Sequence, residues 1–145
     1  MTEKLLKFLI YEKEVLAELI RLAEEQQKAL VKFDMNRLEK ITELQERAAI
    51  TLKDAEDGRI RFLIAWLGIN RKDAHSLRLS SLEHHFKGED VLKIRFLRKE
   101  LSKMFAQIRE INSTNRVLVY RASRTVTQII TAFSNGRNVV CNVTI

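Results

Sequence analysis

The chain has 145 residues, a formal net charge of +7 and a hydrophobic fraction of 46%, and it contains no proline and four glycines. These values indicate one soluble globular domain with enough apolar residues for a substantial core. Good helix formers such as Leu, Lys, Glu, Arg, Ala and Gln are abundant, so the composition predicts an all-α protein.

The first residues and the cysteine content bear on the cellular compartment. The apolar patch at 5–11 is interrupted by Lys7 and followed by Glu12, whereas a signal peptide or a membrane span needs a longer clean run. The single cysteine, Cys141, cannot form a disulfide within the chain, as is usual in a reducing compartment. We therefore expect a cytoplasmic protein that does not insert into a membrane.

Residues 3–31 are predicted to form a first helix about 43 Å long at 1.5 Å per residue. Its apolar residues recur with helical spacing. One side of this helix carries Leu5, Leu9, Leu16, Leu19, Ala23 and Leu30.

Residues 34–67 are predicted to form a second helix. Asp34 has the short polar side chain of an N-cap, and Gly68 suits a left-handed C-cap. Gly58 costs up to about 1 kcal/mol relative to alanine inside a helix, so we expect a bend there. The apolar positions are Leu38, Ile41, Ala48, Leu52, Ala55, Phe62 and Trp66.

Residues 69–88 are predicted to form a connector with short helical turns. Asn70 is expected to cap one turn, and Ser80 or Ser81 another. About 20 residues can cross the length of a short bundle, so the last helix need not be a hairpin neighbour of the second.

Residues 89–133 carry the most informative pattern, an apolar stripe with steps of three or four residues. It predicts a third helix about 68 Å long, which exceeds the second helix by roughly 16 Å and the first by roughly 25 Å. Residues 122–133 would then lack cover within the chain, and residues 134–136 are expected to stop the helix before an irregular tail. The stripe consists of Ile94, Leu97, Leu101, Phe105, Ile108, Asn112, Asn115, Leu118, Ala122, Val126, Ile129 and Phe133.

Asn112 and Asn115 stand where aliphatic side chains are expected. Buried asparagines can fix the register of a bundle through hydrogen bonds across helices. Alternatively, the two amides mark the point where the bundle stops shielding the third helix, so that they meet a partner. Both interpretations stay open from the sequence.

Together these elements predict a single helical domain over 1–145, folded as an elongated antiparallel three-helix bundle. It comprises a hairpin at 1–68, a connector at 69–88, a long helix at 89–134 and a tail at 135–145. The apolar overhang at its end predicts an interaction site for an amphipathic partner helix.

Charge is distributed unevenly along the chain. Residues 1–58 hold 10 basic and 13 acidic groups, 59–88 hold 6 and 2, and 89–145 hold 10 and 4. The basic face of the last helix is interpreted as a solvated face that complements the acidic first helices. Nucleic-acid binding is not expected, because Tyr120 alone adds an aromatic ring to that face and no nucleic-acid-binding motif occurs.

No motif for catalysis or cofactor binding occurs in the sequence. The chain lacks a phosphate-binding glycine loop, zinc-ligand spacing and a nucleophile elbow, so we expect neither an enzyme nor a cofactor. His75, His84 and His85 do not predict a metal site, because consecutive helical residues point about 100° apart and no cysteine or paired carboxylate completes a ligand set.

Several residues in order resemble the FlgN-type flagellar export chaperones, and the resemblance covers most of the chain. The asparagine pair in the long last helix is its most specific part, whereas Gly58 and a tail without a tyrosine depart from the family pattern. The matching residues are Ala29, Leu30, Asp34, Leu38, Ile41, Leu52, Glu56, Arg59, Leu67, Gly68, Asn112, Asn115 and Leu118.

That resemblance implies a cytosolic chaperone of flagellar type III secretion. It would bind C-terminal helical segments of the hook-filament junction proteins, prevent their premature assembly and deliver them to the export gate and its ATPase components. The family's role for a tyrosine in docking on the gate falls on Tyr120. The expected cargo-binding residues are Asn115, Leu118, Ala122, Val126, Ile129, Ile130 and Phe133.

Two other readings remain. The exposed stripe could close by self-association, which would make the protein a coiled-coil scaffold or a homodimer. A basic helical protein that binds nucleic acid is the remaining alternative. Light scattering on the purified protein separates self-association from one-to-one cargo binding, and the salt dependence of any DNA or RNA binding tests the last reading.

Overall fold

The structure is a computed structural model that describes the backbone of residues 2–144 and the side chains of residues 2–75, 77–78 and 80–135. These backbone residues contain helices and turns and no strand, which confirms the all-α class. The elements in chain order are α1 (Thr2–Lys32), α2 (Met35–Leu67), α3 (Arg71–Ser76), α4 (Leu79–Leu82), the 3-10 turn η1 (Glu83–His85) and α5 (Glu89–Thr144).

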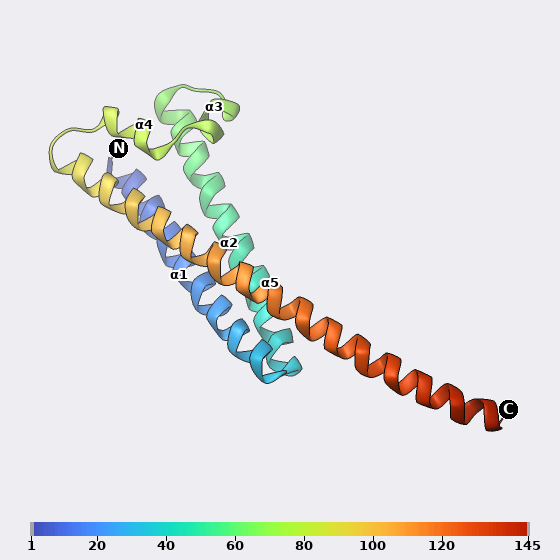
Figure 1. The fold of residues 1–145 in the computed structure, drawn as a ribbon. Helices are drawn as coiled ribbons and strands as arrows, with labels where there is room; N and C mark the ends of the chain where they lie inside the picture. Colours follow the sequence, from blue (N-terminus) through green and yellow to red (C-terminus); the bar gives the residue numbers. More distant parts are fainter. Residues whose placement is uncertain (1, 145) are drawn as a thin grey trace.

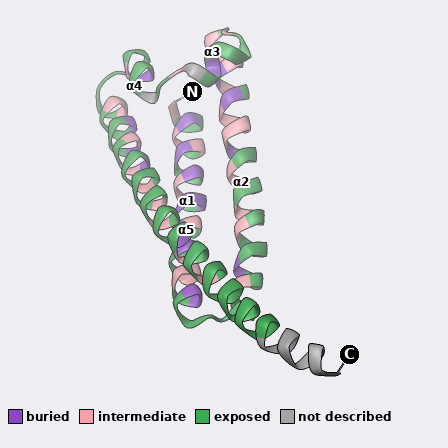
Figure 2. Cartoon of the chain, turned by 45° about the vertical axis from the view of Figure 1, so that its right-hand side comes forward, coloured by how far each residue is buried: buried purple, intermediate pink, exposed green. Residues whose placement is uncertain are grey.

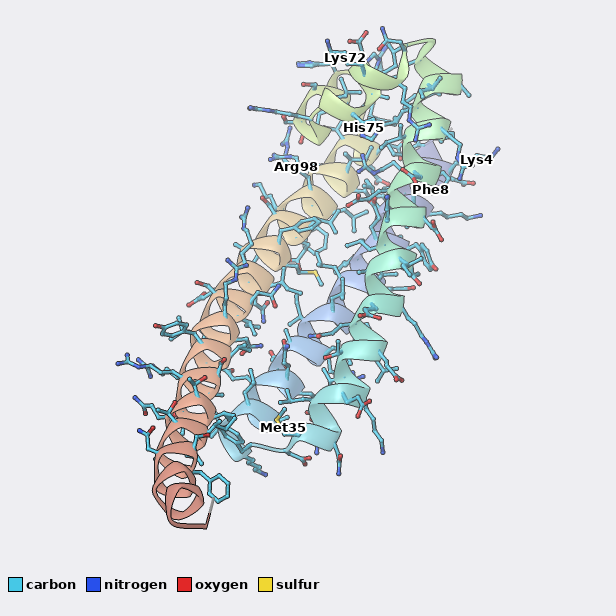
Figure 3. All side chains as sticks on the ribbon, turned by 90° about the vertical axis from the view of Figure 1, so that its right-hand side faces the viewer. Lys4, Phe8, Met35, Lys72, His75 and Arg98 are labelled. Carbon is cyan, nitrogen blue, oxygen red and sulfur yellow. The ribbon has the colours of Figure 1, made fainter. Side chains whose placement is uncertain are left out.

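In Figure 1 the three long helices run down, up and down again, and α5 projects past the α1–α2 hairpin. Helix α1 packs against both α2 and α5, whereas the backbones of α2 and α5 do not approach each other. Figure 3 shows α1 between the other two. The bundle is therefore built around α1, and one side of it stays open between α2 and α5.

The main core fills the end of the bundle that the connector covers. Helix α1 contributes a leucine row to it, and Leu82 of α4 and Phe86, which follows η1, close it from above. Phe62 and Trp66 of α2 stack at 5.7 Å between ring centroids, and Phe86 packs on Trp66 at 5.4 Å. The buried members of this core are Leu5, Leu9, Leu16, Ile20, Leu63, Leu82, Phe86, Ile94, Leu97 and Leu101.

Helices α1 and α2 are joined by a tight turn that forms as the sequence predicts. Asp34 accepts a hydrogen bond from the Arg37 backbone N–H at 3.1 Å, which satisfies one of the free donors at the start of α2. Phe33 adopts a left-handed conformation with φ of 58°. A small second core of Leu22, Ala29 and Ile41 holds this end of the hairpin together.

Gly68 ends α2 as predicted, with φ of 66° and its N–H donated to the Ile64 carbonyl at 3.0 Å. Asn70 caps α3 by accepting from the Asp73 N–H at 2.8 Å. The predicted cap at Ser80 or Ser81 is wrong. Helix α4 begins after Arg78, which makes no side-chain capping hydrogen bond.

Gly58 makes a close packing contact with α1. Helix α2 runs through Gly58 without a break. A Cβ atom at this position would lie 3.1 Å from Phe8 Cε1, which is closer than ordinary van der Waals contact. The glycine therefore lets the Phe8 ring lie against the backbone of α2.

Helix α5 differs from its prediction at its end and along its buried face. Its backbone is helical to Thr144, so the stop at 134–136 and the irregular tail are not observed, since a single glycine costs only about 1 kcal/mol within a helix. Met104 and Ile111 pack against the core, whereas Phe105 is exposed. None of the helices within the described residues is long and apolar enough to cross a membrane.

Candidate functional site

The candidate site is the open side of the bundle together with the projecting part of α5. Helices α2 and α5 form its two walls and α1 its floor. Figure 2 shows buried residues along α1 and an exposed surface along the lower half of α5. The groove has an apolar lower end, a polar middle with amide side chains and a charged upper end.

The apolar end is a hollow of about 410 Å³ beside the turn between α1 and α2. Leu30 forms part of its floor, Leu38 part of one wall, and Val126 part of the other. Polar atoms in it are few. The full lining is Gln26, Leu30, Phe33, Met35, Leu38, Thr42, Val119, Ala122, Ser123, Val126 and Thr127.

Beyond this hollow α5 continues without a neighbour (Figure 1). Ile129, Ile130 and Phe133 are 63%, 58% and 66% exposed, so they form an apolar strip in solvent. Leu118 and Ala122 are half-buried, and Ala122 and Val126 connect the strip to the hollow. These positions agree with an uncovered apolar stripe at the end of α5.

Asn115 lies elsewhere, with an exposure of 3%, inside the bundle. Its Nδ2 donates to the Ala23 carbonyl at 2.8 Å and to Gln26 Oε1 at 3.2 Å. Gln26 Oε1 also accepts from Gln45 Nε2 at 3.1 Å. This polar ladder joins all three long helices and fixes the position of α5 along α1.

The two asparagines therefore have separate environments. Asn112 is exposed and lines the middle of the groove, where it makes no hydrogen bond to the described residues. Asn115 holds the register, but its Oδ1 is buried without a hydrogen-bond partner. Turning the amide over would bring Oδ1 against the Ala23 carbonyl, and two acceptors cannot bond each other, so the unpaired atom is the oxygen.

We expect Asn115→Leu to change the free energy of unfolding by less than about 1 kcal/mol. It removes neutral hydrogen bonds worth roughly 0.5–1.5 kcal/mol each, but it also removes an unpaired buried oxygen that costs about 1–3 kcal/mol. Urea unfolding of the variant measures the difference. Asn112→Leu, at an exposed position, is the control, and a loss above about 3 kcal/mol at Asn115 would show that the ladder is essential to the fold.

The charged end of the groove contains a buried ion pair. Arg59 Nε donates to Glu12 Oε1 and Oε2 at 3.0 and 3.1 Å, and Glu12 is only 5% exposed. Burial raises the pKa of the Glu12 carboxyl, while the charge and hydrogen bond of Arg59 act in the opposite direction. The burial of this carboxyl could have been predicted from the sequence, because Glu12 lies on the same helical face as Leu5, Leu9 and Leu16.

Glu83 of η1 holds the connector onto α5. It accepts a hydrogen bond from Arg98 Nε at 3.0 Å and lies 3.5 Å from Arg95 Nε. Burial favours the neutral carboxyl, but hydrogen bonds and charge from Arg98 and Arg95 hold the pKa of Glu83 below its usual value. Arg78, by contrast, is exposed at the upper end of the groove, where no ion pair of the described residues engages it.

The described side chains contain no group of three or more His, Cys, Asp or Glu placed to hold a metal ion. His85 packs edge-on against Trp66, with ring centroids 6.0 Å apart. The lining of the groove offers apolar contact, hydrogen-bonding groups and charge.

Comparison with known proteins gives one result. The family model described as FlgN protein matches residues 1–144 of the chain. No curated protein and no solved structure matches it.

Proposed function

The chain belongs to the FlgN family of flagellar export chaperones, and on this premise we propose that it binds the hook-filament junction proteins in the cytoplasm before their export. It keeps their C-terminal helical segments from assembling early and delivers them to the type III export gate. The observation that carries the proposal is the apolar strip at the end of α5, which is exposed at Ile129, Ile130 and Phe133 and continues into the hollow beside Leu30.

An exposed strip of this kind supports cargo binding for a physical reason. Monomeric proteins rarely leave several large neighbouring apolar side chains in water, and such strips usually mark an interface. A helical partner segment can lay its own apolar face along α5 and into the hollow. The proposed cargo contacts on the strip are Leu118, Ala122, Val126, Ile129, Ile130 and Phe133.

Co-expression with the hook-filament junction proteins of the same bacterium tests the proposal. We expect a one-to-one complex on size exclusion with light scattering, and a chaperone that is monomeric without cargo. A stable homodimer that binds none of these proteins would support a self-associating scaffold instead.

Tyr120 is proposed to contact the export gate rather than the cargo. It is 65% exposed and does not line the hollow, and its neighbours in sequence include Arg116, Arg121 and Arg124. Aromatic and arginine side chains often anchor protein partners.

We expect Tyr120→Ala to leave cargo affinity within about twofold of the wild type and to lower cargo secretion by about tenfold. A pull-down and a secretion assay on the same strain measure the two effects. Tyr11→Ala, which removes another exposed tyrosine from α1, is the matched control. Equal loss of binding and secretion would assign Tyr120 to the cargo contact or to the fold.

A further inference from the structure

The groove extends above the apolar strip as three successive hollows along α1. Glu12, Leu19 and Gln26 line it from α1, seven residues apart, and so lie on one face of that helix. Its lower and middle hollows share Gln26 and Val119. On α2 the path runs from Leu38 to Arg59, which corresponds to roughly 32 Å at 1.5 Å per residue. A helix of about 20 residues has this length.

The middle of this path contains two groups that lack partners. Asn115 Oδ1 is buried and unpaired, and Asn115 lines the hollow of about 410 Å³ between Leu19, Ala49 and Ile108. Arg116 lines the same hollow, is exposed and forms no ion pair with the described residues.

The charge of the α5 wall selects the occupant. Between Glu110 and Asn135, α5 carries Arg116, Arg121 and Arg124 and no acidic residue. A cargo helix with acidic side chains along one edge is attracted to this positive charge.

We propose that the groove between α2 and α5 takes one amphipathic cargo helix of about 20 residues, which completes a four-helix bundle. Its apolar face lies on α1 and its acidic edge lies beside Arg116. This inference rests on the proposed function and extends its contact surface from the strip at the end of α5 along the rest of the groove, together with the chemistry of the segment bound there.

The test uses the full chain and a fluorescent peptide of the C-terminal helical segment of each hook-filament junction protein. Arg116→Glu is expected to weaken peptide binding about tenfold, whereas Arg116→Lys stays within about threefold. The matched control is Arg109→Glu, an exposed position on α5 that does not line the groove, and it should change the affinity less than twofold.

A further pair of variants examines the shape of the groove. Ala49→Trp fills the middle hollow and should weaken binding at least tenfold, whereas Glu43→Trp, exposed on α2 outside the groove, should not. Circular dichroism checks that each variant stays helical.

The outcomes separate the two proposals. No binding of any peptide to the wild-type chain overturns the proposed function and this inference together. Binding that needs the end of α5 but is unchanged in Arg116→Glu and Ala49→Trp leaves the function standing and overturns the groove. Groove variants that block self-association rather than cargo binding would make a second copy the occupant and also overturn it.

Discussion

Arg59→Met is expected to lower the free energy of unfolding by about 3–5 kcal/mol at pH 7, because it leaves the Glu12 carboxylate buried without a counter-charge. Glu12 is 5% exposed and both of its oxygens accept from Arg59. A methionine can replace the packing of the arginine stem but not the charge. Urea unfolding at constant ionic strength measures the loss.

This loss should depend on pH with a definite sign. The pKa of Glu12 is already raised by burial in the folded protein, and removal of the Arg59 charge raises it further. A carboxyl whose pKa is raised on folding stabilises the fold below its unfolded pKa, and this contribution disappears as the pH rises through the folded pKa. The deficit of the variant should therefore be smallest in acid and should grow as the pH rises toward 7.

Two comparisons make the interpretation specific. Glu12→Gln combined with Arg59→Met should recover most of the loss, since the buried charge is then absent. Arg61→Met, at an exposed position on the same helix, should change stability by less than about 0.5 kcal/mol. An Arg59→Met effect as small as that of Arg61→Met, or one independent of pH, would contradict the role assigned to the pair.

Truncation after Arg121 is expected to abolish cargo binding while the bundle remains folded. It removes Ala122, Val126, Ile129, Ile130 and Phe133. Burial of the last four side chains against a partner could supply on the order of 6–10 kcal/mol before the costs of association, at about 1.5–3 kcal/mol each. The buried core of α5 ends at Asn115, so the remaining helix keeps its packing.

Circular dichroism and a cargo pull-down on the same sample measure both effects. A chain that ends at Ser134 is the matched control, because it keeps the strip and removes only the residues after it. We expect this control to bind cargo within about threefold of the wild type. Cargo binding retained after truncation at Arg121 would move the site to the hairpin, and loss of helicity would mean that the strip supports the fold.

Local features of this fold could be predicted from the sequence, because their causes lie within a few residues. The cap by Asp34 and the left-handed Gly68 depend on side-chain chemistry next to the helix ends, and both are observed. The three long helices were predicted within two residues at their first ends, because apolar spacing reports helical periodicity directly. The projection of α5 beyond the hairpin could be predicted because its apolar stripe is longer than those of the first two helices.

Contacts between distant residues could not be predicted in this way. The sequence predicts that Gly58 interrupts its helix. Its packing partner Phe8 lies fifty residues earlier in the chain, so helical spacing around Gly58 gives no sign of the contact. Asn112 and Asn115 looked equivalent, and only the packing of α5 on α1 separates the exposed amide from the buried one. Spacing gives the apolar stripe of a helix, but a small rotation decides which edge of the stripe is buried, as Met104 and Phe105 illustrate.

The central position of α1 sets the order in which the fold closes. The contact between Gln26 and Gln45 joins α1 to α2 across 19 residues, whereas Asn115 joins α5 to Ala23 across 92. Because loop-closure entropy grows as (3/2)RT ln n, the longer connection costs about 1.4 kcal/mol more to form. The hairpin of α1 and α2 is thus the part of the bundle that a growing chain can close first. Helix α5 is synthesised later and docks last, onto the face of α1 that α2 leaves uncovered.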